Sequence, residues 1–499
     1  MSNTPNPIPD PELARNMMNR DPVAEPQLAG TKEEPPPHKR PVEPTNFSVT
    51  PLELEAYLNQ FVIGQADAVS VLATKVATHY NRMRLEIQNP NLQHIVGNIK
   101  PNVILIGPTG VGKTYIVRLI ADYIKVPFVK GDATKFSETG YVGGDVEDLV
   151  RELVHVSGGD IAAAERGIIY IDEIDKIASA ANTVGIDVSR SGVQRNLLKI
   201  MEETEVDMKV PHDIASQMEA VIELQRTGKA DRKKVNTRNI LFIVSGAFSH
   251  LDEIVRKRLR GGTIGFGKRG TVITDGEAWS QHITAQDLMT FGFETEFVGR
   301  LPVMVKLSQL GVEELCKILK SPNGAVIEGK KRDFLAYGIE LEFTDDALLL
   351  LAEQASMEGT GARGILAVIE KVLLPFEKRL PGKVTKLTVT RDMVLKPLET
   401  LQSVLEQAAI FQFQRDMLSE YSLAFVLSES AQRWAIERAV KENVDVVALL
   451  KERLKNYPYG LKLLGLTAFE ITVEALENPQ EYLDEKIKTT FAKSGKTSR

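Results

Sequence analysis

The sequence predicts an α/β fold with a mainly parallel sheet, followed by mostly helical segments. Strand and helix signals alternate from Asn102 to about Ser308, as in folds whose parallel strands are joined by helices. Residues 107–114 read GPTGVGKT, a phosphate-binding pattern, and they lie between the apolar run Val103–Ile106 and residues at helical spacing. These observations predict a large α/β domain that binds a nucleotide at a phosphate loop.

The chain of 499 residues exceeds the size of a single hydrophobic core, so we expect several domains. Helical periodicity dominates from 313 onward, interrupted by strand-like runs at 339–343 and 386–389. The predicted parts are a disordered proline-rich arm (1–47), a large ATPase domain (48–310), a small domain (311–398), an extra mostly helical segment (399–491) and a flexible tail (492–499).

Composition narrows the class of protein. A hydrophobic content of 43% and a charged content of 26% are typical of soluble globular chains. We expect no membrane partner, because no apolar run approaches the roughly 18 residues of a membrane span, and residues 1–10 lack a secretory signal. Cys316 is the only cysteine, which excludes a disulfide framework and favours a cytoplasmic location. The net charge of −6 argues against nucleic acid as the main partner.

The phosphate loop predicts binding of ATP with Mg²⁺. Its glycines let the backbone wrap an anion at a helix N-terminus. Lys113 is expected to reach the β- and γ-phosphates, and the Thr114 hydroxyl to bind Mg²⁺. The predicted nucleotide-binding residues are Gly107, Pro108, Thr109, Gly110, Val111, Gly112, Lys113 and Thr114.

A second motif supplies carboxylates for hydrolysis. The apolar run Ile168–Ile171 is followed by Asp172 and Glu173, 58 residues after Thr114. Asp172 is expected to face Mg²⁺, and Glu173 to orient the water that attacks the γ-phosphate. The alternative is a strand that merely ends in acidic residues.

Residues Gly140–Gly143 place an aromatic and a β-branched residue between two glycines. This pattern favours an exposed mobile loop over a tight turn with a core tyrosine.

Four segments, taken in order, resemble the ClpX and HslU families of AAA+ unfoldases: 62–65, the phosphate loop, 140–143 and 172–177. The resemblance covers about residues 49–398. Residues 188–195 and 240–248 are closer to HslU, whereas the overall layout favours ClpX.

The resemblance implies a homo-hexameric ring with each nucleotide between neighbours. Arg300, in 296–302, matches the arginine finger, and Arg363 matches the second sensor. Val62 and Ile63 match positions that pack on the adenine. An ordinary salt bridge for Arg300 and ordinary core packing for Val62 and Ile63 remain open alternatives. Ser245 lies where a γ-phosphate sensor is expected, although a serine at a strand end needs no function.

Two further loops have roles implied by the resemblance. Tyr141 and Val142 match the pore loop that grips polypeptide substrates. Ile264, Gly265 and Phe266 resemble the loop by which ClpX docks on a ClpP-type peptidase, unless these side chains tuck into their own core.

The function predicted is therefore an ATP-dependent protein unfoldase that threads substrates into a partner peptidase. Two alternatives are a remodelling ATPase that works without a peptidase and a nucleic-acid motor with the same core. The chain departs from ClpX in lacking a four-cysteine zinc domain, and in the segments 212–229 and after 398. One internal echo, 337–341 against 459–463, suggests either a partial duplication of the small domain or a chance match.

Overall fold

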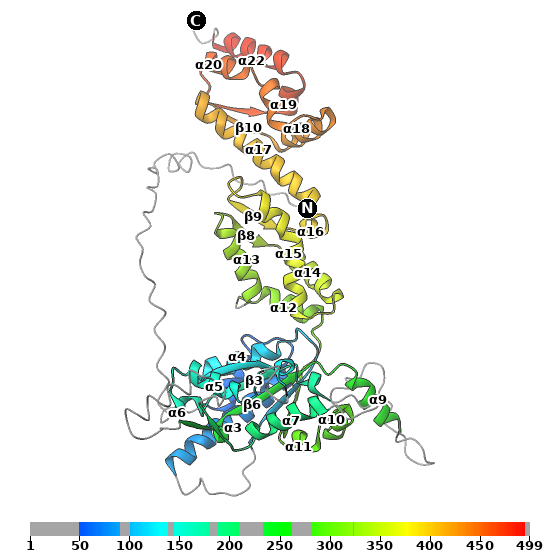
Figure 1. Cartoon of the computed structure of the whole chain (residues 1–499). Coiled ribbons are helices and arrows are strands. Elements are labelled where there is room, and N and C mark those ends of the chain that lie inside the picture. Colours follow the sequence, from blue (N-terminus) through cyan, green and yellow to red (C-terminus); the bar gives the residue numbers. More distant parts are fainter. Residues whose placement is uncertain are drawn as a thin grey trace. The chain divides into compact units, whose positions relative to one another are not determined.

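The computed structural model describes residues 49–89, 100–137, 144–178, 188–208, 233–261, 282–322 and 324–494. It confirms the predicted α/β class with a five-stranded sheet in which every neighbouring pair runs parallel (Figure 1). The strand order is β2-β3-β6-β1-β7. The strands are β1 (Val103–Ile106), β2 (Phe128–Asp132), β3 (Ile168–Asp172), β6 (Leu241–Gly246) and β7 (Val303–Lys306).

Both faces of this sheet are buried, which explains the nearly continuous apolar sequence of its strands. Along β1, Val103 and Leu105 join one hydrophobic cluster, whereas Ile104 and Ile106 join a second. Helices α2 (Pro51–Leu58), α3 (Ala66–Gln88) and α4 (Lys113–Ile124) contribute to the first. The second is covered by α5 (Asp148–Val156), α6 (Ile161–Ala164), α7 (Val188–Met201), α9 (Leu251–Gly261), α10 (Ala285–Phe291) and α11 (Thr295–Gly299).

Short elements complete this part of the chain. The strands β4 (Glu205–Asp207) and β5 (Lys234–Asn236) pair antiparallel. Single 3-10 turns are η3 (Ala133–Lys135), η4 (Ile174–Ile177) and η5 (Thr237–Asn239). Among the described residues, no helix is both long and apolar enough to cross a membrane.

The next part confirms the two predicted short strands. They are β8 (Glu340–Phe343) and β9 (Lys386–Val389), and they pair parallel. The accompanying helices are α12 (Val312–Lys320), α13 (Ala325–Leu335), α14 (Asp345–Met357), α15 (Ala362–Arg379) and α16 (Arg391–Leu395).

The C-terminal part also contains a parallel pair, β10 (Ala424–Leu427) with β11 (Ala468–Ile471), which the sequence did not predict. Its buried side chains, from Ile410 to Leu483, form a hydrophobic cluster of their own. The helices are α17 (Pro397–Tyr421), α18 (Glu429–Glu442), α19 (Val446–Arg453), α20 (Tyr457–Leu463), α21 (Val473–Glu477) and α22 (Pro479–Ser494).

These two parts repeat one another, and we call residues 339–401 the first repeat and 423–483 the second repeat. In each, a strand leads into a helix whose hydroxyl N-cap also joins the strand pair. Thr344 N donates to Val389 O in the first repeat, and Ser428 N donates to Ile471 O in the second. The helix after it buries residues at matched positions: Ala347, Leu351 and Ala355 in the first repeat, and Ala431, Ala435 and Ala439 in the second.

The ends of the repeats match as well. A threonine follows each second strand at the N-cap position, and a short helix is then followed by one non-helical residue and a proline. That residue is Lys396 (φ −135°, ψ 66°) in the first repeat and Asn478 (φ −123°, ψ 66°) in the second. We conclude that the C-terminal part is a second copy of the small-domain fold.

The sequence echo pairs the wrong segments. Residues 337–341 lead into strand β8, whereas residues 459–463 lie in helix α20. The segment that corresponds to 339–343 is 423–427, because these two segments occupy the same place in the strand pairs. The echo is therefore a chance match of common residues, although a duplication is present.

Candidate nucleotide site

The phosphate loop joins the carboxyl end of β1 to the N-terminus of α4, as its sequence predicts. Gly110 and Gly112 have positive φ angles of 76° and 96°, which only glycine adopts readily. A Cβ at Gly110 would also lie 2.0 Å from Thr360 O. The loop therefore requires glycine for both conformation and space.

Lys113 is buried at the start of α4. Its Nζ donates to the loop carbonyls of Gly107 (2.6 Å) and Pro108 (2.7 Å). Burial lowers the pKa of Lys113, while Asp172 and Asp175 act in the opposite direction. The ammonium is thus held inside the loop, where a bound phosphate would replace main-chain carbonyls as its partner.

Four side chains meet behind the loop in one hydrogen-bonded group. The Thr114 hydroxyl lies 3.0 Å from the Tyr170 hydroxyl and 3.4 Å from Asp172 Oδ2. The Tyr170 hydroxyl is 2.6 Å from Ser245 Oγ, and Ser245 donates to Asp172 Oδ1 at 2.7 Å. The structure therefore brings together Thr114 and Asp172, as predicted, and adds Ser245 from the neighbouring strand β6.

Asp172 is held as an anion. Partial burial opposes its ionisation, but the hydrogen bond from Ser245 and the contact with Lys130 lower its pKa below the usual range. Lys130 Nζ lies 3.0 Å from Asp172 Oδ2, from the adjacent strand β2. An ionised carboxylate beside a hydroxyl is a donor set that suits Mg²⁺.

Glu173 has a strained backbone, with φ of 56° and an exposed side chain. Non-glycine residues in this region cost about 1–3 kcal/mol and occur often at functional sites. The conformation turns the chain sharply after β3, so the Glu173 carboxylate is solvent-accessible beside Asp172.

The predicted second sensor contacts the phosphate loop directly. Ala362 N, at the start of α15, donates to Gly110 O at 2.9 Å. Arg363 is the next residue, and its charge contributes to lowering the pKa of Lys113. The first turn of α15 thus places a second cation near the loop.

Arg300 lies elsewhere. Asn102, which precedes β1, donates from Nδ2 to Arg300 O at 3.1 Å, whereas the phosphate loop follows β1. The strand between Asn102 and Gly107 spans about 16 Å. The Arg300 guanidinium pairs instead with Glu202, with 2.5 Å between Nη2 and Oε1. The structure therefore does not bring Arg300 to the phosphate loop of its own chain.

The remaining predicted residues are only partly placed. Val62 and Ile63 are half-buried in the turn between α2 and α3, and Val62 packs against the first hydrophobic cluster. The predicted pore-loop residues Tyr141 and Val142 lie outside the described residues, as do the predicted docking residues Ile264, Gly265 and Phe266.

The sequence did not indicate three residues that contribute to this site. The apolar run Ile168–Ile171 predicts only a buried strand residue at Tyr170, whereas its hydroxyl joins the Thr114 group. Lys130 gave no signal, because its partner is brought to it by strand pairing alone. Asp175 is buried, and its Oδ1 accepts from Ala247 N at 3.3 Å. Its position in the acidic run after β3 was the available signal.

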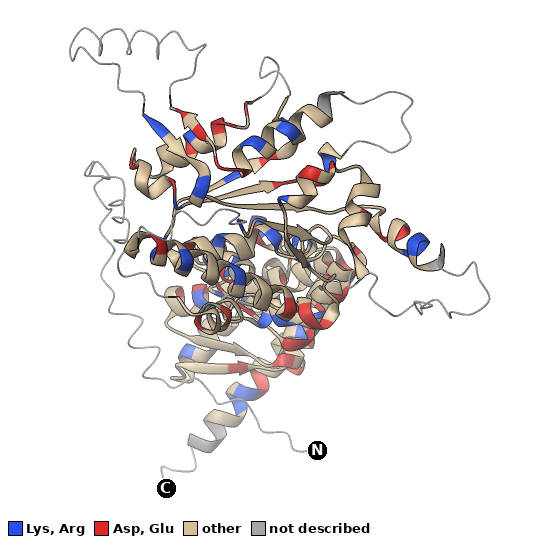
Figure 2. Cartoon of the chain, turned by 90° about the horizontal axis from the view of Figure 1, so that it is seen from below, with Lys and Arg blue, Asp and Glu red and all other residues tan. Residues whose placement is uncertain are grey.

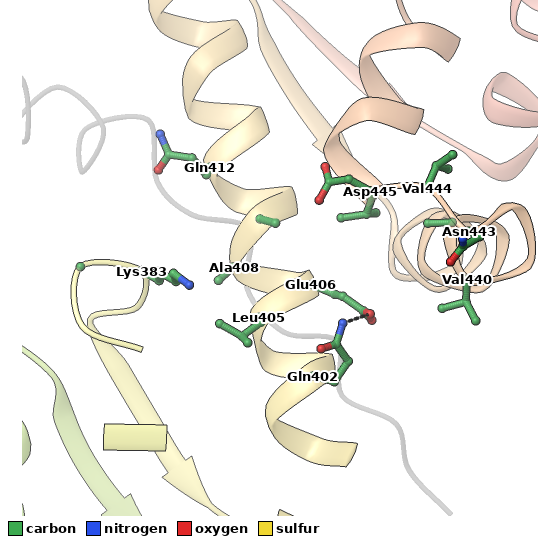
Figure 3. A pocket seen from close by; sticks show the side chains of 14 residues that line it. Lys383, Gln402, Leu405, Glu406, Ala408, Gln412, Val440, Asn443, Val444 and Asp445 are labelled. Carbon is green, nitrogen blue, oxygen red and sulfur yellow. Dashed lines mark hydrogen bonds between the residues drawn. The ribbon is translucent and has the colours of Figure 1, made fainter. Parts of the chain in front are cut away.

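A separate cavity of about 750 Å³ contains none of the predicted site residues (Figure 3). It lies between α17 and the turn that joins α18 to α19, beside Gly382 and Lys383. Acidic and basic residues are interspersed over the described helices (Figure 2). Neither this cavity nor the distribution of charged residues indicates a nucleotide site other than the phosphate loop.

The part of the chain that carries this site resembles known proteins. Residues 99–304 match the AAA domain (Cdc48 subfamily), and residues 310–386 match the C-terminal, D2-small domain, of ClpB protein. Curated relatives named "ATP-dependent Clp protease ATP-binding subunit ClpX" include one from Borrelia duttonii (strain Ly), 39% identical over 69% of this chain and 78% of the relative. Another, from Treponema denticola, is 41% identical over 67% of this chain and 78% of the relative.

The sequence identity to these two relatives, and the share of their length that the chain covers, are high enough to establish that it belongs to their family. The matched AAA domain includes Lys113 of the phosphate loop and the hydrogen-bonded pair Thr114 and Asp172. The chain is an AAA+ ATPase and belongs to the ClpX family.

Proposed function

We propose that this chain is the ATPase subunit of a Clp-type protease, which unfolds polypeptides and threads them into a ClpP-type peptidase. The observation that carries the proposal is the meeting of Lys113, Thr114 and Asp172 at the phosphate loop, in a chain whose relatives are named as Clp protease ATP-binding subunits. A ring of six subunits and a cytoplasmic location belong to the same proposal.

ATP would bind with its phosphates in the loop 107–114 and its adenine near Val62 and Ile63. Mg²⁺ would be held by the Thr114 hydroxyl and the Asp172 carboxylate, and it would offset charge on the β- and γ-phosphates. Glu173 would orient the attacking water, and Lys113 and Arg363 would stabilise the negative charge of the transferring phosphoryl group.

Arg300 is proposed to act on the neighbouring subunit's nucleotide. Support comes from its position at the opposite end of β1 from its own phosphate loop. A finger supplied in trans would make ATP hydrolysis depend on assembly. The side chain is half-exposed, so it can leave Glu202 for an incoming anion.

Two loops outside the described residues would use the energy released by ATP hydrolysis. Tyr141 and Val142 would push on polypeptide in the central channel, and Ile264, Gly265 and Phe266 would dock on the peptidase.

The proposal is tested with Glu173→Gln. This variant should bind ATP with normal affinity, hydrolyse it at least about 100-fold more slowly, and retain polypeptide substrates in a pull-down. Lys113→Met, which should not bind ATP, is the matched control and should capture none. Normal ATP turnover in Glu173→Gln would remove Glu173 as the water-orienting residue.

The peptidase partner is tested separately with Phe266→Ala. Co-purification with a ClpP-type peptidase is expected from the unaltered chain and not from the variant. If the unaltered chain captures no such peptidase yet still unfolds a stable substrate, the protein is a remodelling ATPase.

A further inference from the structure

Arg300 is held at two points within its own chain. The first holds its main chain. Asn102 is almost fully buried, and its amide is paired on both sides: Nδ2 donates to Arg300 O, and Oδ1 accepts from Phe242 N at 3.3 Å. One side chain thus joins the start of β1, the start of β6 and the residue that carries the guanidinium.

The second point holds the side chain. The Arg300 guanidinium contacts the Glu202 carboxylate just after α7, and both side chains are roughly half-exposed. The two residues come from distant parts of the sequence, so this contact is not a local consequence of helix spacing.

The main chain of Glu202 is held by hydrogen bonds from neighbouring residues. The buried Thr237 hydroxyl donates to Glu202 O at 2.6 Å and accepts from Thr204 N at 3.1 Å. Lys100 Nζ donates to Thr237 O at 2.8 Å. These bonds hold the main chain of Glu202, so its carboxylate extends from a fixed position beside Arg300.

We propose that Asn102 and Glu202 are positioning residues for Arg300: Asn102 fixes the finger's main chain, and Glu202 holds its guanidinium until a neighbouring subunit's phosphate replaces it. This rests on the proposed trans role of Arg300. Glu202 then restrains the ATPase, because the guanidinium must leave one anion to reach another. Asn102 supports the ATPase, because a loosened main chain would misplace the finger.

The two residues are therefore expected to act in opposite directions. Glu202→Gln in the full chain should raise kcat for ATP by about two- to fivefold, the range expected for an exposed ion pair. The gain should shrink at high salt, which screens such pairs. Glu205→Gln is the matched control: it removes a similarly exposed pair with Lys234 (2.8 Å) that does not touch Arg300, and it should leave kcat unchanged.

Asn102→Ala should lower kcat by about tenfold with little change in KM, since the nucleotide's own loop is intact. Tyr80→Phe is its control, because it also removes a buried donor to a main-chain carbonyl, Arg166 O at 3.0 Å, away from the finger. Melting temperatures separate a loss of folding from a loss of positioning, and Glu202→Gln is a surface change that should not impair folding.

Both effects must vanish when Arg300 is already alanine. Additive effects of Glu202→Gln or Asn102→Ala in that background would overturn the proposal, as would an unchanged or lowered kcat in Glu202→Gln alone. If Arg300→Ala itself leaves the ATPase of the assembled ring unchanged, the finger role fails first. A loss with Arg300→Ala but no response to Glu202→Gln refutes the positioning role alone.

Discussion

The two repeats share one fold and differ in the turn that follows their first helix. In the first repeat this turn contains Gly361 and leads to Arg363, and the next helix donates from Ala362 N to the phosphate loop. In the second repeat the turn ends at Asp445, whose carboxylate accepts from Val447 N and Ala448 N. The second helix start is therefore capped by its own acidic side chain, which disfavours an anion there. The contact with the phosphate loop therefore belongs to this turn and not to the shared fold.

The surfaces of the repeats also differ. At four positions the first repeat exposes an apolar side chain where the second repeat has a polar one. The matched pairs are Leu349 and Arg433, Met357 and Lys441, Leu395 and Glu477, and Leu398 and Gln480. The reverse also occurs, because the exposed Val426 and Val440 of the second repeat match Glu342 and Ser356 of the first, so each repeat has its own apolar surface positions.

The largest effect that separates the repeats is expected from Arg363→Ala. Removing this cation from the phosphate site should lower kcat/KM for ATP by about 10- to 100-fold, because the transferring phosphoryl group loses a source of charge stabilisation. Lys451→Ala removes an exposed cation from the corresponding helix α19 and is the control. Steady-state ATPase assays measure both. Equal losses in the two variants would mean that the repeats do not differ in nucleotide contact.

A smaller effect is expected from Gly361→Ala. Gly361 has φ of 61° and ψ of −141°, a region open essentially to glycine, and its Cβ would lie 2.8 Å from Gly110 O. The strain of about 1–3 kcal/mol should separate the turn from the phosphate loop and weaken ATP binding about fivefold or more. Titration with a fluorescent ATP analogue measures this.

Val444→Ala, in the corresponding turn of the second repeat, is the matched change. Val444 is partly exposed, so its truncation should leave ATP affinity unchanged. If Gly361→Ala binds ATP normally, the contact between Ala362 and Gly110 is not needed for the nucleotide site.

Sequence alone predicted the parts of the site whose signals are local. The phosphate loop and Asp172 stand in short patterns flanked by apolar strands, so both the fold class and the meeting of Thr114 with Asp172 could be predicted. The contact of Lys130 with Asp172 could not, because it depends on which strands are neighbours. The position of Arg300 beside Asn102 likewise depends on β1 and β7 pairing in register.

The sequence did not predict the second repeat, for a different reason. Its likeness to the first lies in buried alanines, N-caps and strand hydrogen bonds, which few identical residues mark. The helices between the strands also differ, with α15 in one repeat and α19 and α20 in the other. A comparison of short identical runs therefore found residues 459–463, which form a helix.

The smallest effect is expected from removing the second repeat. A chain ending after Ala409 keeps Leu401, which belongs to the first hydrophobic cluster, and loses the cluster that begins at Ile410. Because no residue is shared between these two clusters, ATPase activity per subunit should stay within about twofold of the full chain. Arg363→Ala should abolish most of the activity in the shortened chain too. In the shortened chain, the first hydrophobic cluster could unfold at the same temperature as in the full chain while ATP hydrolysis is lost. That result would show that the second repeat acts on the nucleotide site. Unchanged hydrolysis with lost capture of substrates would place its role in binding polypeptide.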